Sequence, residues 1–434
     1  YGEDIDTFTP LQHPADDVSS DIITTHFEYH SIEQNLLKLD MLGKGDPTMI
    51  RMLEDLTGVD AVKDIPLDAP EVLSLFKNTD ALGITPDQIG GCRLGVMGIP
   101  EFNTDFAMQM LIEAKPDSVA DLVRIAGLAH GTDVWSGNTQ DLILSGTATL
   151  KTAISTRDDI MLYLIKTGLE PAMAFDIMEN VRKGKVAGGK CDKWPGYKEA
   201  MEEHDVPEWY IESCQKIKYM FPKAHAAAYV MMAWRIAWYK IHYPLAFYAS
   251  YYTIRASGFD YELMCLGRDV LEKNLALFKA RRAGKTAGPE TSVTEDVPSA
   301  DSFGSDDSDL DADRAEQGAL SHKDLLTLRD MRVAQEMYER GFEFAPLDIY
   351  KADPEVFTVT EDGRVMPSIS SISGMGLKAA ESVARAAKDG EFLSRDDFRE
   401  RTKVSQTMVE KMNELGLLGS VPETNQLSFF DLLQ

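Results

Sequence analysis

The chain has 434 residues, 44% hydrophobic and 26% charged, a composition typical of a globular protein with more than one domain. No apolar run reaches the length of about 18 residues that a membrane-spanning helix needs, so we expect no membrane partner. The four widely spaced cysteines exclude a zinc knuckle and favour a cytoplasmic location. The chain opens at Tyr1 rather than at Met, and we expect it to be part of a longer reading frame.

The formal net charge of −27 would argue against a nucleic-acid partner if the charge were evenly spread. Residues 283–320, however, carry ten acidic side chains and only two basic ones. Basic residues gather instead at 182–185, 216–223 and 281–282. Local distribution decides such cases, so the acidic total leaves nucleic-acid binding open.

In chain order, residues 1–42 are predicted to form strands and turns, with a β-branched and aromatic stretch from Ile22 to Tyr29. Helical periodicity begins at Asp46 and continues to about residue 282. Residues 283–320, rich in Ser, Asp, Gly and Ala, are typical of a disordered linker or insertion. An amphipathic helix over 321–342, a compact segment to about residue 420 and a short tail follow. The predicted fold class is α+β and mostly α-helical.

A single carboxylate, Asp40, interrupts the apolar alternation from Leu37 to Gly43. A carboxylate in an apolar strand is costly unless it is paired or bound to a metal ion. Phosphoryl-transfer sites use carboxylates to hold Mg²⁺, because this ion prefers hard oxygen ligands. The residues alone leave a second interpretation open, in which Asp40 ends the strand and caps the next turn.

The stretch from Lys216 to Tyr229 combines three lysines with aromatic residues and a run of alanines. Pro222 is suited to the first turn of a helix that continues to about Lys240. Lys223 and His225 then lie at the positive end of the helix dipole, where phosphates bind readily. His225 and Tyr229 are four residues apart and share a face. The alternative is an ordinary buried helix in which the alanines are close-packing positions.

Three shorter segments between these motifs also present basic side chains. Residues 127–135 form a glycine-bounded turn that exposes His130, and Thr156 begins a helix with Arg157 near its tip. Arg182 and Lys183 end another helix, whose predicted apolar face comprises Phe175, Ile177, Met178 and Val181. Each segment alone could equally be a solvated loop or a helix cap.

Two motifs lie near the end of the chain. Gly374, Gly376 and Lys378 are predicted to form a hairpin before a helix, and backbone amides there can hold a DNA phosphate. A plain glycine-rich connection is the alternative. The tail from Gln426 to Phe430 places two aromatic rings on an exposed segment, a pattern typical of a peptide that docks in a partner's groove. The alternative there is a terminal segment that docks on the chain itself.

Two of these strings carry a resemblance to a known family. The strings around Asp40 and from Lys216 to Tyr229 resemble the palm and fingers signatures of bacterial C-family replicative DNA polymerases, closest to the C-terminal part of the PolC-type DNA polymerase III alpha subunit. The resemblance implies the end of a polymerase-β-like palm (1–45), fingers (46–282), an acidic insertion (283–320), a helix-hairpin-helix duplex-binding region (321–420) and a clamp-binding tail (421–434).

The resemblance implies template-directed DNA synthesis, in which deoxynucleotides are transferred to a primer 3′-hydroxyl with Mg²⁺ as cofactor. Asp40 would be one catalytic metal ligand, and the other two expected aspartates would lie outside this chain. The implied partners are primer-template DNA, deoxynucleoside triphosphates, the sliding clamp (beta) and other replicase subunits. The implied nucleotide contacts are Arg157, Arg182, Lys183, Lys223, His225, His130, Phe221 and Tyr229. The implied DNA contacts are Gly374, Gly376 and Lys378, and the implied clamp contacts are Gln426, Leu427, Phe429 and Phe430.

Two other functions remain open at this point. The first is a catalytically inactive module that binds DNA and docks on the clamp, in which Asp40 has no role. The second is a repair-type helix-hairpin-helix protein, for which the palm and fingers strings would be coincidences. Protection of Lys223 by a bound nucleotide would separate the polymerase from this second function.

Overall fold

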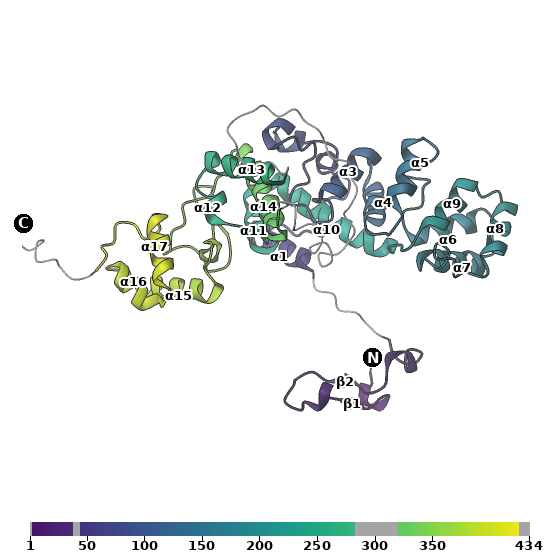
Figure 1. Cartoon of the computed structure of the whole chain (residues 1–434), viewed down its shortest axis with the longest axis horizontal. Helices are drawn as coiled ribbons and strands as arrows, with labels where there is room; N and C mark the ends of the chain where they lie inside the picture. Colours follow the sequence, from purple (N-terminus) through teal and green to yellow (C-terminus); the bar gives the residue numbers. More distant parts are fainter. Residues whose placement is uncertain (1, 38–43, 283–319, 425–434) are drawn as a thin grey trace, which may run out of the picture. The chain divides into compact units, whose positions relative to one another are not determined.

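The computed structural model describes residues 2–37, 44–282 and 320–424. The chain divides into two compact units, residues 1–44 and residues 45–434. Among the described residues, no helix combines the length and apolar character that crossing a membrane requires. The two units are described separately below (Figure 1).

The first unit consists of short turns and one small hairpin. Strands β1 (Leu11–Gln12) and β2 (Thr24–Thr25) pair antiparallel, between the 3-10 turns η1 (Ile5–Thr7), η2 (Pro14–Asp16) and η3 (Tyr29–Ser31). The predicted extended stretch from Ile22 to Tyr29 is wrong for most of its length, since only Thr24 and Thr25 form a strand. Ile22 and Ile23 are 63% and 59% exposed, so no apolar face among residues 2–37 holds the stretch in a sheet. Asp40 lies outside the described residues.

The regular structure in the described part of the second unit is helical apart from one two-stranded sheet. Its helices before residue 283 are α1 (Gly45–Thr57), α2 (Pro70–Leu75), α3 (Asp105–Ala114), α4 (Val119–Ala129), α5 (Gln140–Leu144), α6 (Arg157–Lys166), α7 (Pro171–Arg182), α8 (Trp194–Glu203), α9 (Glu208–Lys216), α10 (Lys223–His242), α11 (Pro244–Ile254), α12 (Tyr261–Met264) and α13 (Arg268–Arg282). Short turns η4 (Asp80–Leu82), η5 (Pro86–Ile89) and η6 (Trp135–Thr139) lie among them. These bounds confirm the predicted helix starts at Arg157 and Lys223 and the helix end at Arg182.

Helix α10 is central to the main hydrophobic core, where it packs against α1, α2, α4 and α11. Its apolar side is unusually wide, and Trp234 and Tyr239 are both fully buried. Their polar tips still find partners, because the Trp234 indole N–H donates to Pro66 O and the Tyr239 hydroxyl donates to Val59 O. The helix therefore anchors segments that are far apart in the sequence.

Helix α14 (His322–Glu339) begins beyond the undescribed segment 283–319 and returns to this same core, packed against α13. It also carries Glu336, which forms a fully buried ion pair with Lys240 of α10 at 2.8 Å. The amphipathic helix predicted over 321–342 is confirmed. Its packing places it with the helices before residue 283, although the sequence grouped it with the duplex-binding region.

A second hydrophobic core lies in residues 345–418, with Tyr261 as a contribution from α12. It contains the antiparallel pair β3 (Thr358–Val359) and β4 (Val365–Met366), the turn η7 (Ile369–Ser371), and helices α15 (Leu377–Lys388), α16 (Arg395–Thr402) and α17 (Gln406–Glu414). Helix α16 packs against both α15 and α17, and the three lie together in Figure 1. The predicted helical hairpin before Leu377 therefore belongs to a small domain with its own core.

Candidate functional site

The first turn of α6 is organised around the carboxylate of Asp159. One oxygen, Oδ2, accepts hydrogen bonds from the Thr156 N–H at 2.9 Å, the Thr156 hydroxyl at 3.1 Å and the Ser155 N–H at 3.3 Å. This is a capping box, in which a residue in the third helical position satisfies amides that precede the helix. The cap fixes the direction of α6 and the position of its tip.

The N-terminus of α10 is attached to this same turn. Asp158 Oδ2 accepts the N–H of Lys223 at 2.8 Å, and Asp159 Oδ1 contacts the Lys223 ammonium at 3.2 Å. The Arg157 N–H donates to Phe221 O at 3.4 Å. The structure thus brings the start of α6 and the start of α10 together across more than sixty residues. We call this contact between Arg157–Asp159 and Phe221–Lys223 the α6–α10 junction.

Two details of the junction differ from the predicted helix start. Pro222 is the N-cap residue of α10, immediately before its first turn. The first amide of the helix, that of Lys223, is held by Asp158 and so differs from the free phosphate donor that the sequence predicted. The side chain of Lys223 remains 41% exposed, so its ammonium is still accessible to an anion.

Four aromatic rings from two segments gather beside the junction. The Phe221 ring lies 4.9 Å from His130, 5.8 Å from His225 and 6.3 Å from Tyr229, measured between ring centroids. His225 and Tyr229 are 6.1 Å apart, which confirms that they share a face of α10. We call these four residues the ring cluster. Rings beside cations suit a nucleotide, which presents both flat apolar and anionic groups.

His130 reaches this cluster because a loop fixes it at the end of α4. Thr132 and Tyr219 form an antiparallel bridge, and the Lys218 ammonium contacts Asp133 at 2.8 Å. At Gly131, any side chain would collide with the Tyr219 carbonyl and the Val134 side chain, so a close approach of two backbones requires glycine there. The loop after α4 is therefore tied to the segment that precedes α10.

Arg182 and Lys183 lie at the end of α7, where both pair with Glu179. Arg182 donates to the two carboxylate oxygens at 2.7 and 2.9 Å, and Lys183 contacts the same group at 2.9 Å. The hydrogen bond from Arg182 lowers the pKa of Glu179 to about 2. Gly184 follows with a φ of +65° and passes close to Lys218 O, which places the helix end near the segment that leads into α10. Both cations are therefore already partly neutralised by Glu179.

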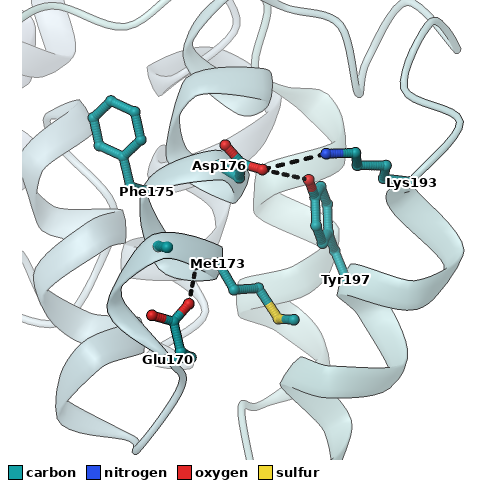
Figure 2. Close-up of a pocket in the computed structure, with 7 residues that line it drawn as sticks. Glu170, Met173, Phe175, Asp176, Lys193 and Tyr197 are labelled. Carbon is teal, nitrogen blue, oxygen red and sulfur yellow. Dashed lines mark hydrogen bonds and ion pairs between the residues drawn. The ribbon is translucent and has the colours of Figure 1, made fainter.

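The prediction that Phe175 belongs to the apolar face of α7 is wrong. Ile177, Met178 and Val181 are buried, but Phe175 is 50% exposed. It lines a shallow surface pocket with Met173, and in Figure 2 its ring points away from the group formed by Asp176, Lys193 and Tyr197. Asp176 there accepts from the Lys193 ammonium at 3.4 Å and the Tyr197 hydroxyl at 3.3 Å. Phe175 lies on the solvent face because α7 covers the core with residues 174, 177, 178 and 181.

The predicted DNA-contacting residues all lie exposed on one hairpin. Gly374 has a φ of +88°, which favours glycine, and Gly376 is the N-cap of α15. Within the described chain, the amides of residues 376–378 make no hydrogen bond that stabilises the hairpin itself. Lys378 adds a cation in the first turn. The arrangement can therefore receive a phosphate through backbone donors.

The second hairpin of this domain lies between α16 and α17. Its turn spans residues 403–405, with Lys403 at a φ of +59° and Ser405 as the N-cap. Gly416 and Gly419 follow α17, so a left-handed lysine, and not a glycine, makes this turn.

Several predicted sites lie outside the described residues. These are Asp40 and the tail residues Gln426, Leu427, Phe429 and Phe430. Among the described residues there is no group of three or more His, Cys, Asp or Glu side chains that could hold a metal ion. The structure thus provides no test of the predicted metal and clamp contacts.

The sequence analysis did not predict three side chains that lie at the junction. Asp158 and Asp159 hold Lys223, and Arg124 of α4 lies 3.7 Å from Asp159. A Thr-x-x-Asp pattern at Thr156 would have indicated the capping role of Asp159. Glu101, which contacts His130 Nε2 at 2.6 Å, has no comparable signal because its partner is distant in sequence.

Two parts of the chain match known protein families. Residues 46–205 match the model of the bacterial DNA polymerase III alpha subunit finger domain, and residues 341–427 match the helix-hairpin-helix motif. His130 and the Arg157–Asp159 side of the junction therefore lie within the finger-domain match, and the hairpin at 374–378 lies within the helix-hairpin-helix match.

The relatives identify the family within that class. The chain is 48% identical over 423 residues to a PolC-type DNA polymerase III of Caldanaerobacter subterraneus subsp. tengcongensis, covering 98% of this chain and 27% of the relative. It is 46% identical over 428 residues to the PolC-type enzyme of Streptococcus pyogenes serotype M5, covering 99% of this chain and 27% of the relative. The chain belongs to the PolC-type DNA polymerase III family and spans about a quarter of the length of these relatives.

Proposed function

We propose that this chain forms the nucleotide-binding fingers and the duplex-binding region of a PolC-type replicative polymerase, which extends a DNA primer on a template. The observation that carries the proposal is the α6–α10 junction with its ring cluster. There the backbone of Arg157, the Lys223 ammonium and four rings meet from segments far apart in the sequence. The similarity of nearly the whole chain to PolC-type polymerases supports the same function.

The chemistry of the junction suits a deoxynucleoside triphosphate. Lys223, Arg157 and His225 would neutralise phosphate oxygens, and cations fixed in advance stabilise the charge that moves to the leaving pyrophosphate. The ring cluster would contact the sugar or base. Arg182 and Lys183 would contribute less directly, because each already pairs with Glu179. Incoming phosphates must therefore compete with Glu179 for these two cations.

The hairpin at 374–378 would bind the product duplex. Backbone amides at the start of α15 can hold phosphate oxygens without reading a base, so binding there would be independent of sequence and sensitive to salt. The helix-hairpin-helix match over residues 341–427 supports this role. Lys378 would add one phosphate contact.

The cofactor, the clamp and the other replicase subunits belong to the same proposal. Bound Mg²⁺ would activate the primer hydroxyl and stabilise the leaving phosphates, with Asp40 as one ligand. The tail from Gln426 to Phe430 would tether the enzyme to a sliding clamp, so that even weak binding raises the time spent on DNA. Asp40 and the tail lie outside the described residues, so these roles rest on the sequence alone.

The proposal is tested by primer extension with the full reading frame that contains this chain. Lys223→Ala should raise the KM for deoxynucleotides about tenfold, because one charge-assisted contact to phosphate is lost. Lys63→Ala is the matched control, since Lys63 pairs with an acid as well, Asp60, but on an unrelated surface. An equal KM in both variants would contradict the proposed nucleotide site. DNA binding without any extension by the wild type would favour the inactive docking module.

A further inference from the structure

Glu101 has an unusual backbone and an unusual side-chain position. Its φ is +68°, in the left-handed region that residues other than glycine seldom adopt, and its side chain is only 9% exposed. Such strain persists where the surrounding structure requires it, and it is found most often at functional sites. A glycine would adopt this conformation without cost, so the side chain of Glu101 itself calls for a reason.

That reason is visible in the contact between Glu101 and His130. The carboxylate Oε2 lies 2.6 Å from His130 Nε2, between residues 29 positions apart. An ionised carboxylate can only accept, so Nε2 carries the proton, and this bond fixes the imidazole plane. His130 remains 34% exposed, and its ring lies 4.9 Å from Phe221 with 34° between the planes.

We propose that Glu101 is a positioning residue that holds the His130 ring against Phe221, and so fixes one side of the proposed nucleotide site. The inference rests on the proposed function and adds Glu101 to the residues that shape the ring cluster. Loss of the carboxylate leaves His130 free to rotate away from Phe221, and the proposed site then loses one of the rings that contact the nucleotide. Loss of the Glu101 carboxylate should therefore weaken nucleotide binding, because Glu101 contacts the ring cluster at His130.

The test uses the full reading frame and compares Glu101→Gln, Glu101→Ala, His130→Ala and the double variant Glu101→Ala/His130→Ala. Gln retains an oxygen that accepts the Nε2–H, so its KM for deoxynucleotides should stay within about twofold of the wild type. Glu101→Ala should raise the KM about fivefold with little change in kcat, the loss expected for one oriented hydrogen bond. His130→Ala should do the same.

The double variant decides between positioning and simple structural support. If Glu101 acts through His130, the double variant is no worse than His130→Ala alone, because the second change removes nothing further. Lys115→Ala is the control for a left-handed residue outside the site, with a φ of 48° at the end of α3, and should leave the KM unchanged. A melting temperature within about 2 °C of the wild type would show that Glu101→Ala still folds.

Three results would overturn the inference while the proposed function stands. They are an unchanged KM in Glu101→Ala, an unchanged KM in His130→Ala, or effects of the two that simply add. The proposed function fails separately if the wild type does not extend a primer or if Lys223→Ala has no effect. If Glu101→Ala proves too unstable, Glu101→Gly removes the carboxylate while relieving the strained backbone, and the same KM comparison applies.

Discussion

At the scale of single residues, Asp159 serves two helices at once. Its Oδ2 caps α6, and its Oδ1 holds the ammonium of Lys223 at the start of α10. The carboxylate is 13% exposed, so solvent screens this ion pair less than a pair on the open surface. Lys223 is therefore held in a defined place before any ligand arrives, which reduces the conformational entropy lost on binding.

The variant Asp159→Asn tests this arrangement. Asparagine keeps an oxygen for the cap but removes the charge that faces Lys223, so we expect a KM for deoxynucleotides about threefold higher and a stability lower by about 1 kcal/mol. Asp158→Asn is the matched control, because its oxygen can still accept the Lys223 N–H. Steady-state kinetics and urea unfolding measure both effects. Equal KM values in the two variants would show that the ion pair does not position Lys223.

Sequence reasoning succeeded for residues whose partners are local. His225 and Tyr229 share a face, as predicted, because a helix brings residues four apart together. It failed where the partner is distant or the backbone is unusual. The contact of Glu101 with His130 and the left-handed turn at Lys403 have no local pattern that predicts them.

At the scale of elements, helices α10 and α14 are joined by a buried ionic network. The Lys240 ammonium donates to Gly95 O at 2.8 Å, Met97 O at 2.6 Å and Glu336 Oε2 at 2.9 Å. The Tyr248 hydroxyl donates to Glu336 Oε1 at 2.8 Å. Complete hydrogen bonding of this kind is what allows two charges to be buried together.

Breaking one side of this network should cost more than removing both charges. Lys240→Ala leaves the Glu336 carboxylate buried without its cation, and we expect a loss of about 3–5 kcal/mol in the free energy of unfolding. The double variant Lys240→Met/Glu336→Leu fills the space with apolar atoms and should lose distinctly less. Urea unfolding of the three proteins measures the difference. A double variant as unstable as the single one would contradict a dominant role for the unpaired charge.

Burial of Lys240 should make the free energy of unfolding depend on pH. Burial lowers the pKa of Lys240 from 10.5 to about 8. Between these two values the unfolded chain holds a proton that the folded chain has lost, so the free energy of unfolding should rise with pH from about 8 to 10.5. The variant Lys240→Met/Glu336→Leu lacks this contribution. The wild type should therefore gain stability relative to it across this window, and a relative loss would contradict the burial effect.

If the hairpin at 374–378 binds duplex DNA, as we propose, a charge change at the start of α15 should weaken that binding. Lys378→Glu should weaken binding to duplexes of any sequence and lower the slope of log affinity against log salt by about one. Lys388→Glu, at the other end of the same helix, is the control for total charge. Fluorescence anisotropy at several salt concentrations measures both. Identical losses in the two variants would show that general charge, and not the hairpin, determines binding.

Helix positions were largely predictable because the signals that start and end a helix are local. The capping residues at Thr156 and the proline before Lys223 mark α6 and α10 in the sequence itself. The extended stretch predicted from Ile22 to Tyr29 was wrong for most of its length, because a sheet needs a partner strand and a covered face. The described part of the first unit offers only a two-residue pair.

At the scale of the whole molecule, the second unit has two hydrophobic cores, and the boundary between them differs from the predicted domain boundary. Helix α14 joins the core of the helices before residue 283, and the second core comprises residues 345–418 with Tyr261. The sequence assigned α14 to the duplex-binding region, because the acidic stretch 283–320 marks a change of composition and not a change of core. Periodicity finds a helix, but it cannot say which core the helix joins.

The central claim is that the α6–α10 junction binds the incoming nucleotide, and chemical protection of Lys223 tests it most directly. The full reading frame with primer-template DNA is acetylated with and without a saturating complementary deoxynucleotide, and modification of each lysine is measured by mass spectrometry. Protection of Lys223 by the nucleotide, with Lys63 unchanged, is the predicted result. Equal acetylation of Lys223 with and without nucleotide would contradict the claim.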